Sequence, residues 1–348
     1  MKTIHVSTHA PYDVVIGQGI LKDCGSAVKE RFPESGTVIV TDDRVAPLYL
    51  DKLKDAYDEA DIPYISFVIP HGESSKNTAF LLELISFLAK NGLRRDDFIT
   101  ALGGGVVGDL AGLAAALYLR GIPYIQIPTT LLAAVDASVG GKTAVNLEEG
   151  KNLLGAVHQP SLVWCDYETH KTMEYAFYSD GIAEAVKCAV LKGEKLFSLL
   201  ENEPLPRHME EIICSCVELK QRIVSEDEFD TEKRQFLNLG HTIGHAIEAR
   251  SGYRVSHGHA VACGMVAMAE YAAANGLAEF DCRDRIATVL SKYHLPTELP
   301  YPMKELLPYM EADKKRYGDT IRLIIPEAIG HCRMLRLPVA ELKRFFRL

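Results

Sequence analysis

The sequence predicts an α/β fold in two parts: an N-terminal α/β domain with a parallel sheet, and a C-terminal, mainly α-helical domain. In the first half, short apolar runs rich in β-branched residues alternate with amphipathic segments, the pattern of a parallel sheet with helices on both faces. From about Met173 the strand signals mostly stop and long helical patterns follow. The chain of 348 residues exceeds the usual size of one domain, and we expect domains at 1–172 and 173–348.

The individual elements follow from the same patterns. Residues 1–17 alternate like a strand, and apolar runs bounded by turn residues predict further strands at 37–41, 64–69, 98–102 and 124–127. Helical periodicity predicts helices at 77–90 and 109–119, the second after a glycine loop at 103–108. In the second half it predicts helices at 181–200, 209–225, 234–250, 260–275, 284–293 and 303–313, with a late strand at 322–325.

Composition and charge exclude several classes of protein. Acidic residues number 47 against 38 basic ones, and the net charge of −9 argues against a general nucleic-acid-binding protein. The longest apolar runs, such as 110–119, have about ten residues, whereas a membrane span needs roughly 20. The eight cysteines form no CxxC pair, and residues 1–17 lack the apolar core of a secretory signal. We therefore expect a cytoplasmic protein with reduced thiols.

The glycine loop is the first candidate site. Gly103–Gly108 fits GxGxxG between a predicted strand and a predicted helix, where a pyrophosphate can approach the backbone and the helix N-terminus. This pattern makes the first domain Rossmann-like. However, the loop does not lie in the first strand–helix unit, and no acidic residue stands about 20 residues further on. A tight turn that only packs helix against strand is the alternative.

Two lysines in 137–152 form a second candidate. Lys142 and Lys151 each follow a glycine, and Asn152 comes after the second lysine. The spacing of a Walker A loop is missing, but two ammonium groups beside flexible backbone suit a phosphate or a carboxylate. The alternative is a solvated surface loop.

The strongest local pattern is a polar stripe on the predicted helix 234–250. Its members stand at i, i+4, i+7 and i+11, which places them within an arc of roughly 60° on one helix face. They are Arg234, Asn238, His241 and His245. Polar groups at core-facing positions are costly unless they line a site, so we predict a site here. An exposed polar face is the alternative.

The sequence also predicts a metal site. Glu184 and Lys187 stand on an otherwise apolar predicted helix, and a buried carboxylate needs a partner. One Glu with two His can hold zinc and leave a coordination position open. The i, i+4 spacing favours His241 and His245, while His257 lies far enough along the chain to return to the same stripe.

Together these motifs resemble those of the 3-dehydroquinate synthases, a family of sugar-phosphate cyclases. The resemblance runs from about residue 10 to residue 335, and the combination is far more specific than any one motif. The matching stretches are GESSK (72–76), GGGVVGDLAG (103–112), RGIPYIQIPTTLLAAVDASVGGKTAVN (120–146), GKNLLGAVHQP (150–160), GIAEAVK (181–187), FLNLGHTIGHAIEA (236–249) and HGHAVACGM (257–265).

The resemblance implies a dehydroquinate synthase-like fold and a carbon–oxygen lyase. The enzyme would convert 3-deoxy-D-arabino-heptulosonate 7-phosphate into 3-dehydroquinate and phosphate, in the shikimate pathway to chorismate and aromatic amino acids. NAD+ would transiently oxidise a secondary alcohol, phosphate would leave by elimination, NADH would return the hydride, and an aldol closure would form the carbocycle. The implied cofactors are NAD+ and a divalent metal, Zn2+ or Co2+.

The resemblance also assigns ligands to the metal and the substrate. The implied metal ligands are Glu184, His241 and His257, so His257 replaces His245 in the pair that spacing favours. The implied phosphate-binding residues are Lys142, Asn152, Asn238, one of Lys314 and Lys315, and Arg120 of a neighbouring subunit. His245 would either bind the phosphate or relay a proton. Arg234 and Lys220 would bind the substrate carboxylate. The ring hydroxyls would meet Asp136, Lys151 and Lys187, and the implied catalytic residues are His245, Lys142, Asp136 and Lys187.

The resemblance places NAD+ on Gly104 and Gly105. The implied contacts of its nicotinamide half are Asp109, Thr129, Thr130 and Lys142, and those of its adenosine ribose are Asp42, Glu73 and Lys76. Lys151 is a further implied cofactor-binding residue. A cleft between the two domains would hold the substrate and close on it. The role of Arg120 implies a homodimer, with a small phosphorylated sugar acid as substrate and neither nucleic acid nor membrane as partner.

Three places depart from the family pattern. His259 stands where the family most often has Glu, and Asp230 stands where a Glu is usual. At 174–178 the common Pro and Arg-Glu are replaced, in a segment that flanks the cofactor in the family. We interpret His259 as a neighbour of the ligand His257 that alters metal affinity.

Two other enzymes and one non-enzyme fit parts of the pattern. A sister cyclase such as 2-deoxy-scyllo-inosose synthase acts on glucose 6-phosphate, which has no carboxylate for Arg234, and it typically carries an acid in place of Asn238. A metal-dependent polyol dehydrogenase of the glycerol dehydrogenase type would release NADH and would not need the lysine-rich phosphate pocket. A non-catalytic scaffold would be expected to lack a metal ligand, and all three are present.

Overall fold

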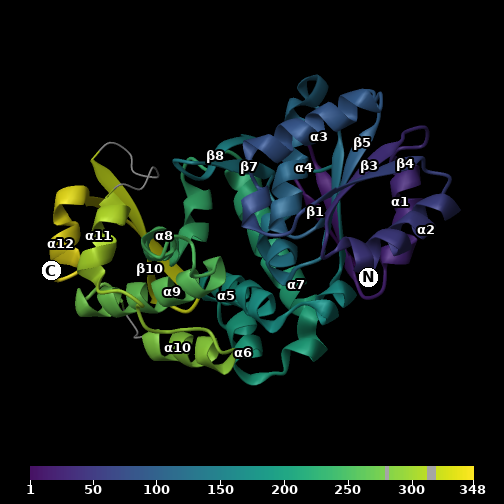
Figure 1. Cartoon of the computed structure of the whole chain (residues 1–348). Coiled ribbons are helices and arrows are strands. Elements are labelled where there is room, and N and C mark those ends of the chain that lie inside the picture. Colours follow the sequence, from purple (N-terminus) through teal and green to yellow (C-terminus); the bar gives the residue numbers. More distant parts are fainter. Residues whose placement is uncertain (279–281, 312–318) are drawn as a thin grey trace. The chain divides into compact units, whose positions relative to one another are not determined.

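The computed structural model describes residues 1–278, 282–311 and 319–348 (Figure 1). The chain divides into two compact units. Unit 1 comprises Met1–Met173 and Lys220–Phe229, and unit 2 comprises Glu174–Leu219 and Asp230–Leu348. The sequence patterns did not indicate that the chain returns to unit 1 at Lys220, because this segment continues a helical pattern of the second half.

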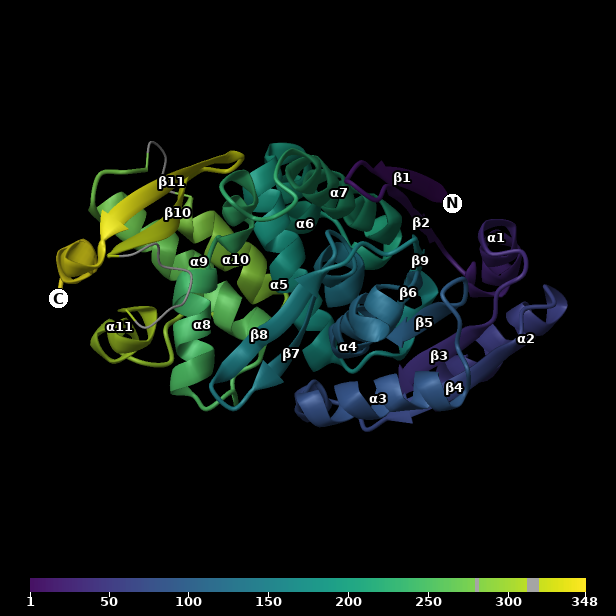
Figure 2. The ribbon, with the colours of Figure 1, turned by 90° about the horizontal axis from the view of Figure 1, so that it is seen from above.

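Unit 1 is built around a seven-stranded sheet with the strand order β1-β2-β9-β6-β5-β3-β4 (Figure 2). Neighbouring strands are parallel except for the antiparallel pair β1 and β2. The strands are β1 Lys2–Val6, β2 Tyr12–Gly17, β3 Thr37–Asp42, β4 Tyr64–Ile69, β5 Phe98–Gly103, β6 Tyr124–Pro128 and β9 Leu162–Asp166. The prediction of a Rossmann-like parallel sheet is confirmed, and β9 is a strand that the sequence patterns missed.

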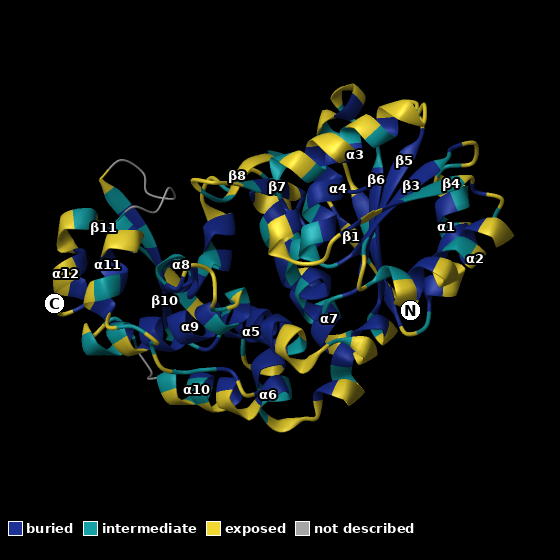
Figure 3. Cartoon of the chain, viewed as in Figure 1, coloured by how far each residue is buried: buried dark blue, intermediate teal, exposed yellow. Residues whose placement is uncertain are grey.

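Helices cover both faces of this sheet. Helices α1 (Cys24–Arg31) and α2 (Asp51–Glu59) share one core with Ile39 of β3. Helices α3 (Thr78–Lys90) and α4 (Gly105–Leu117) share a second core with Val38 and Val40 of the same strand. Successive residues of β3 therefore enter opposite cores, which is why its central run, 38–40, is apolar at every position. The central strands are accordingly buried (Figure 3).

The segment 137–152, for which a solvated loop was the alternative to an anion site, enters a hairpin. Strands β7 (Lys142–Leu147) and β8 (Gly150–Val157) pair antiparallel, so the loop alternative was wrong, and the anion site stays a prediction. The alternation of apolar residues in these strands is weak, because none of the β8 residues is buried. The short helical segments of unit 1 are η1 Leu21–Asp23, η2 Ala46–Leu50, η3 Glu73–Ser75, η4 Tyr118–Arg120, η5 Ala133–Ala137 and η6 Tyr167–Thr172.

The returning segment Lys220–Phe229 is tied to unit 1 by charged hydrogen bonds. It includes the end of α7 (Leu205–Glu226). The Glu228 carboxylate accepts from His9 Nδ1 at 2.6 Å, from the His9 amide at 3.0 Å and from Gln159 Nε2 at 2.7 Å. Lys220 Nζ donates to Asp136 Oδ1 at 2.6 Å. These bonds explain why a segment so distant in sequence belongs to this unit.

Unit 2 is mainly helical, as predicted. One core joins α8, α9, α11, α12 and the hairpin β10–β11. Besides α7, the elements of unit 2 are α5 Tyr175–Lys192, α6 Glu194–Asn202, η7 Lys233–Asn238, α8 His241–Arg250, α9 His257–Ala274, α10 Arg283–Lys292, α11 Met303–Glu311, β10 Thr320–Ala328, β11 His331–Pro338, η8 Val339–Glu341 and α12 Leu342–Phe345. Among the described helices of the chain, none is long and apolar enough to cross a membrane.

The predicted continuous helix 234–250 was wrong. A 3-10 segment, η7, ends at Asn238, Gly240 adopts a left-handed conformation with φ of 77°, and α8 begins at His241. A Cβ atom at Gly240 would lie 2.7 Å from Met265 Cγ and 2.8 Å from the Val261 carbonyl oxygen, so the close approach of α9 also requires glycine. The four residues of the polar stripe therefore do not share one helix face.

His170 of η6 carries a prediction about pH. It is 6 % exposed, and neither ring nitrogen has a hydrogen-bond partner among the described residues. Burial lowers the pKa of His170 from 6.5 to about 4. Between these two pH values the imidazole is protonated in the unfolded chain but neutral in the folded protein. The free energy of unfolding should be unaffected by this group above pH 6.5 and should fall by up to about 3 kcal/mol as the pH drops to 4.

Denaturant unfolding of the wild type and of His170→Phe between pH 7.5 and pH 4 measures this effect. The variant cannot titrate at this position, so its stability should decline less with falling pH. Equal pH dependence in the two proteins would contradict the assignment to His170.

Candidate active site

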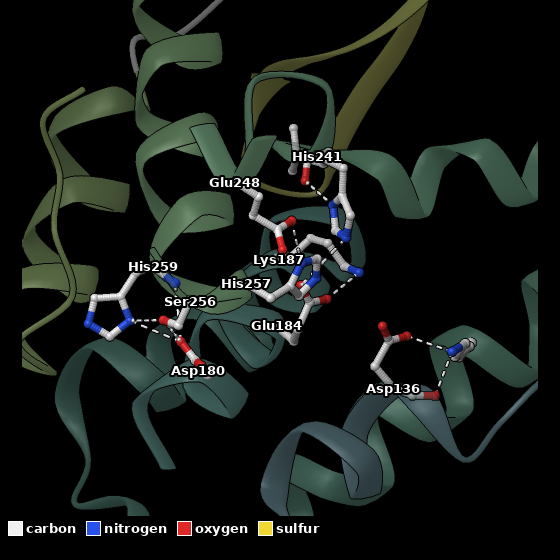
Figure 4. A network of polar contacts seen from close by, with 11 residues as sticks. Asp136, Asp180, Glu184, Lys187, His241, Glu248, Ser256, His257 and His259 are labelled. Carbon is white, nitrogen blue, oxygen red and sulfur yellow. Dashed lines mark hydrogen bonds and ion pairs between the residues drawn. The ribbon is translucent and has the colours of Figure 1, made fainter. Parts of the chain in front are cut away.

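Three helices of unit 2 bring one carboxylate and two imidazoles together (Figure 4). Glu184 lies in α5, His241 is the first residue of α8 and His257 is the first residue of α9. Their ligand atoms lie within 4.8 Å of one another. These are the residues that the resemblance implies as metal ligands, and their binding of a metal stays a prediction.

The spacing of these atoms suits a metal ion better than hydrogen bonds. Glu184 Oε1 lies 3.6 Å from His241 Nε2 and 3.5 Å from His257 Nε2. Two ligands of a tetrahedral ion with bonds of about 2.0–2.1 Å are roughly 3.4 Å apart, whereas N–H···O hydrogen bonds are about 2.9 Å long. Glu184 is fully buried, and its Oε1 has no hydrogen-bond partner within the described part of the chain. An orphaned oxygen facing two imidazole nitrogens fits a bound divalent metal.

A second charge balances Glu184 from its other side. Lys187, one turn along α5, is 1 % exposed and forms an ion pair with Glu184 Oε2. Burial by itself would raise the pKa of Glu184, but the Lys187 ammonium and the His257 imidazole outweigh burial and lower that pKa well below its usual range. Glu184 is therefore ionised at neutral pH, which is the form that binds a metal.

His245 lies beside this set. It follows His241 by one turn of α8, and its ring centroid is 5.4 Å from that of His241 and 6.1 Å from that of His257. It also belongs to a second group of possible ligands, with Glu248 and His257. Its place next to the three predicted ligands suits a residue that contacts substrate near a metal.

Two neighbours of this site were missed by the sequence analysis. Glu248 of α8 is 3 % exposed, and its carboxylate lies 3.1 Å from His257 Nδ1. The i, i+3 spacing of His245 and Glu248 was the signal that could have found it. Asp180 of α5 is the other, and no local pattern marks it, because its partners come from α9.

Asp180 holds the first turn of α9. Its Oδ1 accepts from Ser256 Oγ at 2.7 Å, from the His259 amide at 3.2 Å and from His259 Nδ1 at 2.9 Å. The helices touch here, because a Cβ atom at Gly258 would lie only 2.3 Å from Asp180 Cα. His259, one of the departures from the family pattern, thus pairs with a carboxylate of α5 next to the predicted ligand His257.

The substitution His259→Glu tests this pairing. A carboxylate at 259 would face the Asp180 carboxylate and lose the Nδ1 donor, so we expect a loss of about 1–3 kcal/mol in the free energy of unfolding. Zn2+ affinity should weaken as the first turn of α9 shifts. Denaturant unfolding of the metal-free protein and chelator competition measure the two effects.

The double variant Asp180→Asn/His259→Glu is the matched control. The Asn amide can donate to the new carboxylate, so both quantities should recover. A single variant with unchanged stability and unchanged Zn2+ affinity would show that His259 has no role at the site.

In unit 1, several of the predicted cofactor residues lie at the carboxyl edge of the seven-stranded sheet. Gly104 is the N-cap of α4 and Gly105 its first residue. Thr129 follows β6 and donates its amide to the Gly103 carbonyl at 3.0 Å, while its buried Oγ1 has no partner among the described residues. A helix N-terminus and an orphaned hydroxyl at the carboxyl ends of parallel strands fit a dinucleotide. Asp42, at the end of β3, lies at the same edge.

Four of the predicted unit 1 residues are joined in one network. Lys76 Nζ lies 2.5 Å from Asp109 Oδ2 and 2.6 Å from Asn152 Oδ1. Asn146 links Asn152 to Glu73, because it accepts from the Asn152 amide at 2.9 Å and donates to Glu73 Oε1 at 2.7 Å. Residues predicted to contact the ribose, the nicotinamide half and the phosphate are thus coupled within unit 1.

The remaining predicted residues are placed as follows. Asp136 of η5 accepts a hydrogen bond from Lys220. The residue predicted to contact a substrate hydroxyl, Asp136, therefore pairs with a residue predicted to bind the substrate carboxylate, Lys220. Lys142 begins β7 and Lys151 is the second residue of β8. The buried Arg234 and the half-buried Asn238 lie in η7. Thr130 Oγ1 accepts a hydrogen bond from the Ala133 amide. Arg120 is exposed at the end of η4. Lys314 and Lys315 lie outside the described residues.

Known proteins resemble the chain over almost its whole length. Families described as 3-dehydroquinate synthase N-terminal and C-terminal match residues 66–179 and 181–316. The 3-dehydroquinate synthase of Streptococcus suis (strain 05ZYH33) is 40% identical over 346 residues, 97% of this chain and 98% of that protein. The 3-dehydroquinate synthase of Enterococcus faecalis (strain ATCC 700802 / V583) is 41% identical over 349 residues, 99% of this chain and 97% of that protein.

Solved structures support the same relationship. The structure of 2-deoxy-scyllo-inosose synthase complexed with carbaglucose-6-phosphate, NAD+ and Co2+ has a TM-score of 0.89 and 25% identity, and the match covers 99% of each chain. The fold and the candidate site define an enzyme of the sugar-phosphate cyclase class. Within that class, the chain belongs to the 3-dehydroquinate synthase family.

Proposed function

We propose that this protein is a 3-dehydroquinate synthase, which converts 3-deoxy-D-arabino-heptulosonate 7-phosphate into 3-dehydroquinate and phosphate. The observation that carries the proposal is the assembly of Glu184, His241 and His257 in a chain whose two halves match the two family descriptions. The overall reaction is redox-neutral, although it passes through a transient oxidation.

Unit 2 supplies the metal site and its surroundings. Glu184, His241 and His257 would hold a divalent metal, which would supply Lewis acidity at the hydroxyl that is oxidised. Lys187 pairs with Glu184 and orients a ring hydroxyl, and His245 binds the phosphate or carries a proton beside it. The buried guanidinium of Arg234 binds the substrate carboxylate with its planar fork of donors.

Unit 1 supplies the cofactor residues and further anion contacts. The N-terminus of α4, with Gly104 and Gly105, would hold NAD+, and the cofactor would supply reversible hydride transfer there. The orphaned Thr129 hydroxyl is one candidate contact of the cofactor. Because Lys76 is held by Asp109 and Asn152, it preserves the arrangement of these residues. Lys142 and Asn152 bind the phosphate, while Asp136, Lys151 and Lys220 contact the hydroxyls and the carboxylate.

We further propose a homodimer in which Arg120 reaches the phosphate of the neighbouring subunit. Arg120 and Leu119 are consecutive exposed residues with positive φ of 69° and 49°. Such backbone strain costs of order 1–3 kcal/mol per residue and often occurs at functional sites. Light scattering of the purified protein should give twice the mass of the chain, and a monomer mass would contradict this proposal.

Phosphate release from 3-deoxy-D-arabino-heptulosonate 7-phosphate by the zinc-loaded protein tests the function. Absorbance at 340 nm is followed in the same cuvette, with NAD+ in catalytic amount. Phosphate released over many turnovers with no net NADH is the expected result. Release from glucose 6-phosphate alone would identify a sister cyclase, and net NADH formed from a polyol would identify a dehydrogenase.

A further inference from the structure

We propose that Glu248 is a positioning residue of the metal site. By accepting a hydrogen bond from His257 Nδ1, it fixes the ring and the tautomer in which Nε2 faces Glu184. This inference rests on the metal role proposed above for Glu184, His241 and His257, and it gives a role to Glu248, to which the sequence analysis assigned none.

The ring of His257 lies between two buried carboxylates. Its Nδ1 is 3.1 Å from Glu248 Oε2, and its Nε2 is 3.5 Å from Glu184 Oε1 (Figure 4). Glu248 and Glu184 are 3 % and 0 % exposed. The 3.1 Å separation is a hydrogen-bond distance, and the 3.5 Å separation fits two ligands of one metal ion. The two ring nitrogens of His257 therefore have different kinds of partner.

The contact with Glu248 determines which nitrogen carries the hydrogen. An ionised carboxylate only accepts hydrogen bonds, so Nδ1 must be the donor. In the neutral ring the lone pair is then on Nε2, which faces Glu184. The opposite tautomer carries its hydrogen on Nε2. It would place the Nδ1 lone pair against the Glu248 carboxylate and leave Nε2 without a lone pair for a metal, so Glu248 disfavours that tautomer.

His241 shows the same arrangement with a different partner. Its Nδ1 lies 3.1 Å from the Leu239 carbonyl oxygen, and its Nε2 faces Glu184 Oε1 at 3.6 Å. Both rings therefore present Nε2 to one carboxylate oxygen. The acceptor is a backbone carbonyl at His241 and a carboxylate group at His257, and both kinds of acceptor orient histidine ligands of metals.

A second interpretation would make Glu248 itself a ligand. His245, Glu248 and His257 also place their ligand atoms within 4.8 Å of one another. An ion there would have to displace the hydrogen bond between Glu248 and His257, and it would lack Glu184, whose Oε1 has no hydrogen-bond partner among the described residues. The positioning role accounts for both observations, and the test separates the two interpretations.

The test measures Zn2+ dissociation constants by chelator competition and the visible absorption of the Co2+-loaded protein. Glu248→Gln keeps the shape and removes the charge, so its Zn2+ affinity should fall about 10- to 100-fold with a shifted Co2+ spectrum. Glu248→Asp keeps the charge and should recover part of both. The control is Glu305→Gln in α11, which removes the carboxylate partner of Arg250, a residue of the same helix as Glu248. It should change neither the Zn2+ affinity nor the Co2+ spectrum. Thermal unfolding of the metal-free proteins establishes that all variants fold.

Two outcomes would overturn the proposal. Wild-type affinity and spectrum in Glu248→Gln would show that Glu248 does not act on His257. Loss of Zn2+ binding in His245→Asn together with full binding in His241→Asn would place the ion in the second group, with Glu248 as a ligand. A wild-type protein that binds no Zn2+ would instead refute the metal site of the proposed function.

Discussion

Replacing Glu184 by glutamine is expected to remove metal binding and most of the activity. The carboxylate is fully buried and faces both predicted histidine ligands, and an amide is a poor substitute for a charged oxygen donor. We expect a loss of Zn2+ affinity beyond the about 10- to 100-fold that is typical of outer partners of metal ligands. Chelator competition and phosphate release from the proposed substrate measure the two effects.

The same substitution should also lower stability, and this effect can be separated from metal binding. In Glu184→Gln the buried ammonium of Lys187 loses the carboxylate that faces it, which costs about 3–5 kcal/mol for a buried pair. The double variant Glu184→Gln/Lys187→Met removes the buried charge as well, so the metal-free protein should regain much of its stability and still not bind Zn2+. If Glu184→Gln binds Zn2+ like the wild type, Glu184 is not a ligand.

Replacing Arg234 by alanine should cause the second large loss. Arg234 is 3 % exposed in η7, and removal of one partner from a buried charged pair costs about 2–5 kcal/mol. This corresponds to a decrease in kcat/KM of about 30- to 5,000-fold for the carboxylated substrate. The kcat/KM of Arg234→Lys should lie between those of the wild type and Arg234→Ala, because lysine keeps the charge and loses the planar fork of donors.

A substrate analogue without the carboxylate separates this role from a general defect. With the analogue, wild type and Arg234→Ala should have similar kcat/KM, because the interaction is absent in both. Arg336→Ala is the matched control: this exposed arginine pairs with Glu232, just before η7, and its loss should leave kcat/KM unchanged. Wild-type efficiency of Arg234→Ala with the carboxylated substrate would refute the carboxylate assignment.

The comparison of sequence and structure is most instructive at the histidines. The i, i+4 spacing suggested His241 and His245 as ligands on one long helix. Both histidines do lie in α8, but the left-handed Gly240 separates them from Arg234 and Asn238, because α9 packs too close for any side chain at Gly240. The chain then returns through α9, which brings His257 to Glu184. A contact of this kind depends on helix packing, which periodicity does not encode.

Other contacts were also hidden from the sequence for the same reason. Asp180 and His259 are separated by 79 residues along the chain, and Lys76 and Asn152 by 76. Each residue alone looks like an ordinary polar surface residue. These residues pair where separate helices and strands meet. The helix or strand propensity of a segment does not depend on a distant partner, so it cannot reveal the pair.

The sequence by itself determined the fold class, the family and the set of candidate residues. Alternating buried strands and helices are local consequences of apolar patterning, and the motifs carry the chemistry in contiguous segments. Three features came only from the folded chain: His257 faces Glu184, Glu248 lies 3.1 Å from His257 Nδ1, and Lys220–Phe229 joins unit 1. The physical reason is that such interactions require several elements to pack at once, so their partners are set by the global arrangement of the chain.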